Sequence, residues 1–282
     1  MLLNLIKTAV KPIETTYRSK NSIAAKKSRI APLDFIRGAA ITVMVIFHLF
    51  FTFGEVFGFS SFLWLYEFIA STAIVDVFAG LFIIISGISS SLTKSNLRRG
   101  FKTLGIAVAI TLVTVYLMPL LGYDNLGISF GILHLLSLAM LLSPLLLKLA
   151  DQVPPQVAVP LCTLLFALTR NIREGYIGIT KECANVIIPQ SVREIPFLFP
   201  FGITNDSFFS ADHYPLLPWI FLFIIGIYLG KHLRYAILPE KFYKTICKPV
   251  EAIGRHTLYI YVAHQPVIFF LGLVIEKLFL KK

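Results

Sequence analysis

Long apolar runs separated by short polar segments make up most of this chain of 282 residues. Several runs approach or exceed the roughly 18 to 20 residues that cross a hydrocarbon core about 30 Å thick. Because backbone groups inside a bilayer need partners within the protein, these runs are expected to be helices, and the alternating pattern of a membrane barrel is absent. We therefore predict an all-α, polytopic transmembrane helix bundle of about seven spans, at residues 35–53, 69–91, 103–121, 128–149, 154–169, 213–231 and 256–276.

The composition supports a membrane protein. Hydrophobic residues make up 56% of the chain and charged residues only 15%, and the mean hydropathy is +0.78. An ordinary soluble domain is nearer half apolar and a quarter charged. The long apolar runs are therefore better explained as membrane spans than as the core of a soluble protein.

The basic residues predict the orientation of the bundle. The net charge is +11, but Lys and Arg lie between the apolar runs and form no single basic face, which argues against nucleic acid as a partner. With the N-terminus in the cytoplasm, most of the 26 basic residues fall in cytoplasmic segments, as the positive-inside rule requires. No cleavage site follows the first run, so we expect it to remain as a signal anchor in the plasma (inner) membrane.

The domain organisation follows from these spans. Residues 1–32 are predicted to form a basic cytoplasmic segment, 33–276 the membrane domain and 277–282 a tail. The longest polar break, about 170–212, contains the apolar, proline-broken stretch IPFLFPFGI. Loops of this length are functional or disordered. We expect either an ordered extracytoplasmic cap or re-entrant segment over a site, or a simple surface loop.

Ionisable residues within the spans are the candidate chemistry, because keeping such a group in a bilayer costs a few kcal/mol or more. His48, Asp76, His134 and His213 all fall in the predicted outer half of the membrane, where we expect them to line one cavity. His264 lies about 12 Å into the last span, near the midplane.

Several readings of these residues remain open. A histidine suits a general base near neutral pH, and a carboxylate such as Asp76 could hold the tautomer of His48. The same residues could relay protons in a transporter, or could only hydrogen-bond between helices in a scaffold. Asp34 and Arg37, spaced i, i+3 at a helix start, could be a cap and a snorkelling cation.

The absence of other sequence motifs excludes several classes of function. No Walker loop, GxGxxG, HExxH or GxSxG in a suitable context is present, so nucleotide-binding, zinc-protease and serine-hydrolase functions have no support. The three cysteines are far apart and show no CxxC spacing. We predict neither a disulfide framework nor a metal site.

Five separated stretches resemble the heparan-α-glucosaminide N-acetyltransferase catalytic-domain family, in the order that its bacterial members show. They are LDFIRGAAITVMVIFH at 33–48, FIIISGISSSLTKSNLRRG at 82–100, FGILHLLSLAMLL at 130–142, YPLLPWIFLFIIGIYLGK at 214–231 and GRHTLYIYVAHQP at 254–266.

The resemblance implies a multi-helix membrane protein that moves an acetyl group from cytosolic acetyl-CoA to an acceptor across the membrane, such as an amino sugar or glycan. It implies that Asp34 and Arg37 help form the donor end and that His48 is a catalytic candidate. It further implies that Asp76 and His134 line the cavity, joined by His264.

We therefore expect an acyl-CoA-dependent N- or O-acetyltransferase, with membrane lipid and a second copy of the chain as candidate partners. A proton-coupled transporter or export factor is the alternative. Arg37, with Arg98 and Arg99, would attract the CoA phosphates, because the guanidinium group matches phosphate geometry. His48 would deprotonate the acceptor or become acylated itself, and His134 or His264 would donate to the oxyanion.

Overall fold

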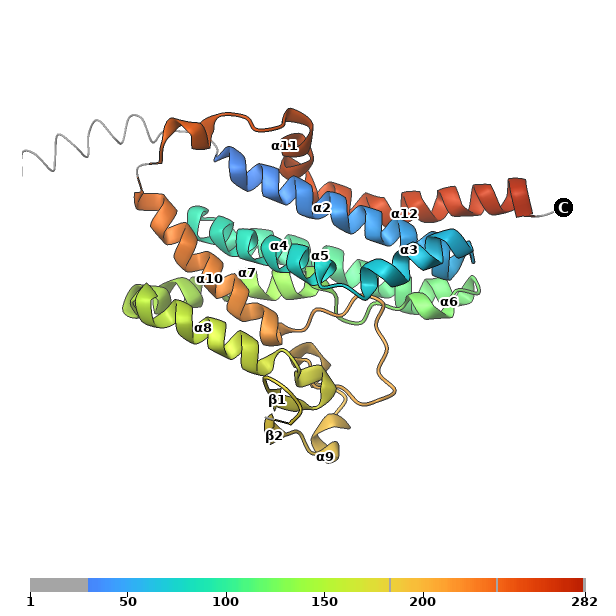
Figure 1. Cartoon of the computed structure of the whole chain (residues 1–282), viewed down its shortest axis with the longest axis horizontal. Coiled ribbons are helices and arrows are strands. Elements are labelled where there is room, and N and C mark those ends of the chain that lie inside the picture. Colours follow the sequence, from blue (N-terminus) through green and yellow to red (C-terminus); the bar gives the residue numbers. More distant parts are fainter. Residues whose placement is uncertain (1–29, 183, 237, 281–282) are drawn as a thin grey trace, which may run out of the picture.

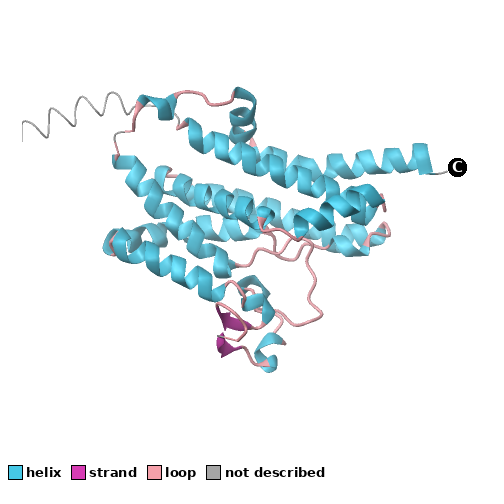
Figure 2. Ribbon diagram, in the orientation of Figure 1, coloured by secondary structure: helices cyan, strands magenta, loops and turns pink. Residues whose placement is uncertain are grey.

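The computed structural model describes residues 30–182, 184–236 and 238–280. Its secondary structure is almost entirely helical, with a single hairpin of two short strands (Figure 2). The predicted all-α class is therefore confirmed. The basic segment predicted over 1–32 lies outside the described residues up to position 29, as do the last two residues of the predicted tail.

Six helices in the described part of the chain are long and apolar enough to cross a bilayer, and each overlaps one of the predicted spans. Three of them include a π-helical turn. The helices are α2 (Ala31–Phe51) with its turn Thr52–Val56, α4 (Ile74–Leu92), α5 (Asn96–Thr111) continued by Leu112–Leu117 and α6 (Met118–Leu120), α7 (Ile132–Gln152), α10 (Leu216–Tyr235) and α12 (Thr257–Ile275) with its own turn Glu276–Leu280.

The predicted fifth span forms α8 (Pro155–Thr169), whose 15 residues rise only about 22 Å. Just before its start, the Val153 carbonyl oxygen accepts a hydrogen bond from the Tyr228 hydroxyl of α10 at 3.2 Å. Near its end, the Phe166 ring lies 5.7 Å from the Trp219 ring at the start of α10. Thus α8 runs antiparallel to α10 along its side (Figure 1), but it is shorter than the bilayer core and is not among the six helices of the described chain that are long enough to cross it.

The two ends of the bundle are chemically different. At one end, the Arg37 side chain near the start of α2 donates to the Ser89 hydroxyl near the end of α4. At the same end, the Arg234 side chain in the last turn of α10 donates to the Ser91 carbonyl oxygen. We call this the basic end. The other end, where α2 finishes and α7 begins, is called the opposite end.

Besides α9 (Gln190–Arg193), two short helices lie wholly or mostly outside the predicted spans. Helix α3 (Ser60–Ala70) follows α2 at the opposite end and stacks the exposed rings of Trp64 and Phe68 on each other. Helix α11 (Lys248–Arg255) precedes α12 and packs on the start of α2 at the basic end (Figure 1). Both are too short for the length criterion that identifies a membrane span, so hydropathy alone missed them.

Close approach of α11 to α2 depends on glycine. A Cβ atom built at Gly254 would lie 1.8 Å from the Asp34 carbonyl oxygen, and one at Gly38 would lie 1.9 Å from the Val250 carbonyl oxygen. The buried Glu251 carboxylate accepts backbone N–H bonds just before α11, including one of 2.6 Å. This capping carboxylate satisfies donors that have no partner at a helix N-terminus.

The centre of the bundle is the contact between α4 and α10. Phe223 and Ile227 of α10 are fully buried there. A Cβ atom built at Gly226 would lie 2.1 Å from the Ile84 carbonyl oxygen, and one at Gly87 would lie 2.1 Å from the Phe223 carbonyl oxygen. Small residues at such contacts are typical of membrane helices, because close van der Waals packing drives their association.

Between α8 and α10 the chain forms a small lobe over residues 170–215. The Asn171 side-chain amide donates to the carbonyl oxygens of Gly178 and Ile179, both at 3.1 Å, and so fastens the lobe to the end of α8. The segment predicted as an ordered cap or a surface loop is thus an ordered lobe. It contains β1 (Tyr176–Gly178), paired antiparallel with β2 (Ala184–Ile187), and α9 (Gln190–Arg193).

Replacing Gly226 by Leu is expected to destabilise the protein by about 1 to 3 kcal/mol, because the added side chain meets the α4 backbone. The melting temperature of the detergent-purified protein measures this effect. Gly105→Leu is the matched control, since a Cβ atom at exposed Gly105 of α5 meets nothing within 4 Å. Equal melting temperatures for the two variants would contradict the close α4–α10 contact.

Candidate active site

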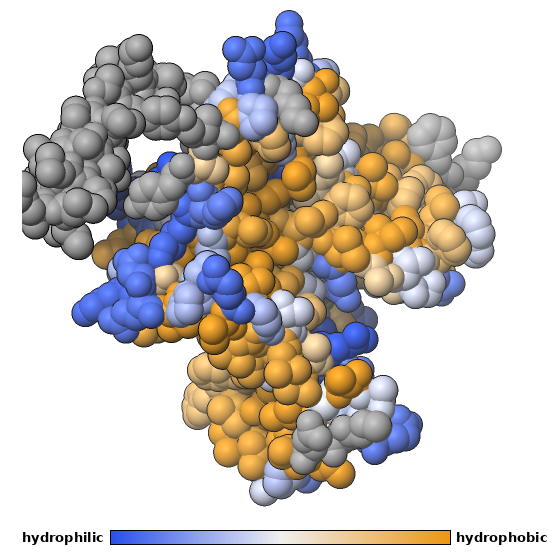
Figure 3. Space-filling view, turned by 60° about the vertical axis from the view of Figure 1, so that its left-hand side comes forward, coloured by the Kyte–Doolittle hydropathy of each residue, from blue (hydrophilic) through white to orange (hydrophobic). Residues whose placement is uncertain are grey.

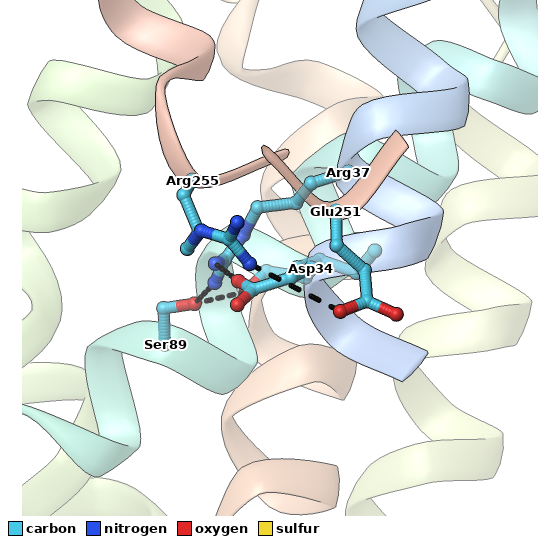
Figure 4. Close-up of polar contacts among 6 residues, drawn as sticks. Asp34, Arg37, Ser89, Glu251 and Arg255 are labelled. Carbon is cyan, nitrogen blue, oxygen red and sulfur yellow. Dashed lines mark hydrogen bonds and ion pairs between the residues drawn. The ribbon is translucent and has the colours of Figure 1, made fainter. Parts of the chain in front are cut away.

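Asp34, Arg37 and Ser89 form the polar cluster at the basic end. The Arg37 guanidinium donates to Asp34 Oδ1 at 3.1 Å and to the Ser89 hydroxyl, which in turn donates to the Ile85 carbonyl oxygen (Figure 4). The predicted i, i+3 pair is therefore formed. It links α2 to α4, and Arg37 is partly exposed, with 24% of its side chain accessible.

Other cations gather at the same end. Figure 4 places Arg255, whose guanidinium lies 4.0 Å from the Glu251 carboxylate, beside the Asp34–Arg37 pair. Arg98 is exposed and Arg99 is half-buried in the first turn of α5. Within the described residues, the side chain of neither Arg98 nor Arg99 makes a hydrogen bond or ion pair. The predicted donor-binding residues thus lie on helices that meet at one end of the bundle.

The C-terminal end of α4 adds further polar groups to this cluster. Its last carbonyl groups need partners, because a helix C-terminus leaves them unsatisfied and carries partial negative charge. Arg234 donates to the Ser91 carbonyl oxygen, and the Asn96 amide donates to that of Ser90 at 2.7 Å. Ser90 Oγ and Asn96 Oδ1 are buried without a partner in the described chain. Sequence reasoning did not single out either residue.

His48 and His264 face each other from α2 and α12. Their ring centroids are 4.9 Å apart, at an interplanar angle of 82°. Each Nδ1 lies against a carbonyl oxygen of its own helix, Met44 at 2.9 Å and Tyr261 at 2.5 Å. A carbonyl oxygen only accepts, so in both rings Nδ1 carries the hydrogen and Nε2 has a lone pair.

The two Nε2 atoms are the reactive feature of this pair. Nε2 of His264 is buried and has no hydrogen-bond partner among the described residues, and His48 likewise makes no bond through Nε2. As neutral rings, both can accept a proton and neither can donate one from Nε2. His264 can therefore donate to an oxyanion only after it is protonated, which restricts the role predicted for it.

His134 uses both of its ring nitrogens. Its Nδ1 accepts the Gly131 backbone N–H at 3.2 Å at the start of α7, so Nε2 carries the hydrogen and faces Thr111 Oγ1 at 3.3 Å. The Thr111 hydroxyl donates to the Ile128 carbonyl oxygen at 2.8 Å. These bonds hold α7 against α5 and favour a structural role for His134.

Asp212 contacts the start of α7 and was not predicted from the sequence as a site residue. Its Oδ2 accepts the Ile132 backbone N–H and the Tyr261 hydroxyl, each at 3.1 Å. A Cβ atom at Gly131 would lie only 2.2 Å from this oxygen, so glycine makes room for the carboxylate. Burial raises the Asp212 pKa to about 6, against the opposing effect of these two hydrogen bonds. Asp212 thus joins the lobe to α7 and to α12.

Asp76 does not pair with His48. It is exposed near the start of α4, and the Met44 carbonyl oxygen takes the place predicted for its carboxylate beside His48. The expectation that Asp76 orients His48 is therefore not met. Burial raises the Tyr214 pKa, and the nearby carboxylates of Asp212 and Asp76 raise it further.

His213 also lies away from the histidine pair. Its Nε2 donates to the Phe199 carbonyl oxygen at 3.1 Å, and burial lowers its pKa to about 4, so the ring is neutral near pH 7. The four outer residues predicted to converge are therefore divided between the histidine pair, the start of α4, the start of α7 and the lobe. No three His, Cys, Asp or Glu residues of the described chain are placed to hold a metal ion.

The fold and the two polar clusters define a multi-pass integral membrane protein with a basic end and a histidine pair between α2 and α12. Residues 29–266 match the family described as heparan-alpha-glucosaminide N-acetyltransferase, catalytic, and the chain belongs to this family. It is therefore a membrane acetyltransferase by family, as the sequence motifs predicted. No curated protein and no solved structure matches the chain.

The raised pKa of Asp212 predicts that the stability of the folded protein depends on pH. Its pKa in the folded protein, about 6, is above the ordinary value of 3.8, so folding is favoured at low pH and this contribution is lost as pH rises from about 4 to 6. A pKa difference of one between the folded and unfolded protein corresponds to about 1.4 kcal/mol of stability. Asp212→Asn should remove this slope from melting temperatures measured between pH 4 and 7.

The exposed carboxylate of Asp124, at the same end of the bundle, provides the control. Asp124→Asn should keep the wild-type slope. An unchanged slope in Asp212→Asn would mean that Asp212 is not the group that titrates.

Proposed function

We propose that this protein transfers an acetyl group from acetyl-CoA, bound at the basic end, to an amine or hydroxyl group of a sugar or glycan on the other side of the plasma membrane. The observation that carries the proposal is the pair of unbonded Nε2 atoms on His48 and His264. Family membership supports the acetyl transfer, and the charge at the basic end supports an anionic donor.

The donor end uses Arg37, Arg98 and Arg99. Their guanidinium groups suit the phosphates of CoA, because they donate in a planar fork that matches phosphate oxygens. Arg37 is held in place by Asp34 and Ser89, so little side-chain freedom would be lost when a phosphate binds. Arg98 and Arg99 have no competing ion pair in the described chain.

Helix α2 connects the two chemical centres. Arg37 and His48 are 11 residues apart on this helix, which corresponds to a rise of about 16 Å. A donor whose phosphates lie at Arg37 therefore needs an extended arm to bring its thioester to His48. The pantetheine arm of CoA has this form, which favours CoA over a compact acyl donor.

His48 would act as the general base. As the acceptor nitrogen or oxygen attacks the thioester carbonyl, His48 Nε2 takes the acceptor proton, the C–S bond breaks, and the proton passes to the thiolate to give free CoA. In a two-step route, His48 Nε2 would itself attack the thioester carbonyl and the C–S bond would break to leave CoA thiolate. The acceptor would then take the acetyl group from Nε2 while its proton passes to the thiolate. The Met44 carbonyl oxygen favours both routes, because it keeps the hydrogen on Nδ1 and stabilises the imidazolium.

His264 would assist through its own lone pair. The two rings are in contact, so a proton on His48 can be stabilised by the neutral Nε2 of His264. The same lone pair can accept a hydrogen bond from the acceptor amine or hydroxyl and orient it. Tyr261 and Asp212 would act at a distance, by holding α12 against α7.

Calorimetry of acetyl-CoA binding to the detergent-purified protein tests the donor site. Binding should be saturable and should weaken at least about tenfold in Arg37→Ala, the loss expected for one charged hydrogen-bonding partner. Lys148→Ala is the matched control, because it removes an exposed positive charge near the same end without touching the cluster. Absence of binding to folded wild-type protein would favour the proton-coupled transporter instead.

Transfer of radiolabelled acetyl groups to amino sugars, in a screen with vesicles, tests the role of the histidine pair. His48→Ala should abolish transfer while donor binding persists, because His48 lies far from the phosphate-binding end. His264→Ala should lower turnover by a smaller factor. Near-normal turnover in His48→Ala would show that His48 is neither the base nor the nucleophile.

A further inference from the structure

The lobe between α8 and α10 exposes large apolar side chains on structure that is not a membrane helix. Ile187 of β2 is 76% exposed and Phe197, just after α9, is 80% exposed. The lower lobe in Figure 3, where β1, β2 and α9 lie in Figure 1, is mostly hydrophobic on the face shown. We call the following five exposed residues the apolar lip: Ile179, Val186, Ile187, Ile195 and Phe197.

The backbone of the lobe limits where the lip can lie. Edge strands and irregular turns leave backbone N–H and C=O groups without protein partners, and such groups are not tolerated against the hydrocarbon core. The hairpin has only two strands, so each strand has an unpaired edge. The lobe must therefore lie outside the hydrocarbon core, although its exposed side chains are as apolar as those of a span.

The lip continues the lipid-facing surface of the bundle. Val157, Leu161 and Leu164 are exposed on α8 at i, i+4 and i+7, so they form one apolar stripe along the helix. The stripe leads toward the end of α8, where Asn171 fastens the lobe through Gly178 and Ile179. The rigid connection places the lip beyond the point where the lipid-facing stripe ends.

We propose that the apolar lip is seated in the interfacial layer of the leaflet at the opposite end, with its side chains among lipid headgroups and upper acyl chains. Exposed apolar patches of this kind mark contact surfaces, and the surface that is continuous with this one is the bilayer. Interfacial helices bury apolar side chains in this layer while their polar groups stay at the surface, and the lip would bind lipid in the same way. The occupant is therefore lipid.

Seating the lip would also position the candidate active site. From α9, the Arg193 guanidinium donates to the Thr204 carbonyl oxygen at 3.0 Å and to Asp206 at 2.6 Å. The chain then runs directly to Asp212, which contacts α7 and α12. A lobe anchored in the leaflet would hold this segment at the membrane surface, where an acceptor is met.

Environment-sensitive fluorophores on single cysteines test the proposal. The background variant replaces Cys162, Cys183 and Cys247 by Ser, and the full chain is placed as one copy per nanodisc of phosphatidylcholine. Ile187→Cys and Phe197→Cys carry the label. Val157→Cys on α8 is the lipid-facing reference. Ser191→Cys, exposed on α9 in the same lobe, is the matched aqueous reference.

Labels at 187 and 197 should show blue-shifted emission, quenching by brominated lipid, and a several-fold loss of iodide quenching relative to the label at 191. Iodide quenching at 187 and 197 equal to that at 191 would overturn the proposal, because the lip would then lie in water. Protection from both quenchers would also overturn it, by indicating that protein covers the lip. Retained donor binding would not affect either conclusion, so the result stands apart from the proposed transfer reaction.

Discussion

A polar group placed inside a bilayer must find its partner within the protein, and this constraint organises both ends of the bundle. At the basic end, Arg37 bridges α2 and α4, and Arg234 satisfies the last carbonyl groups of α4. At the opposite end, the Asp212 carboxylate accepts a hydrogen bond from a backbone N–H at the start of α7 and another from the Tyr261 hydroxyl of α12. The helices are thus tied together where their own hydrogen bonding is incomplete.

The same constraint makes the unsatisfied atoms informative. Most buried polar side chains in the described chain have partners, but five buried side-chain atoms do not, among them Nε2 of His264, whose ring centroid lies 4.9 Å from that of His48. A buried lone pair without a donor is costly, and the proposed function gives this one a proton or a substrate group to accept. His134 shows the contrast, since both of its ring nitrogens are used in holding α7.

Hydropathy predicted most of the fold because a bilayer imposes a length on its helices. The Asp34–Arg37 pair could also be predicted, because both residues lie on one helix at i, i+3 spacing. Contacts between distant segments could not be predicted in this way. The His48–His264 and Asp212–Tyr261 pairs depend on how α12 and the lobe pack against the other helices. Asp76 lies on the predicted helix but is exposed, and His48 instead contacts a carbonyl oxygen of its own helix. A polar residue's depth in a span does not specify which face of the helix it occupies.

We propose that α2 carries a donor-binding end and a catalytic histidine that one extended acyl donor can reach together. A solved structure with a non-hydrolysable thioether analogue of acetyl-CoA tests this claim most directly. We expect phosphates at Arg37 and the acyl carbon in contact with Nε2 of His48. An analogue whose acyl group ends at the basic end, away from both His48 and His264, would contradict it.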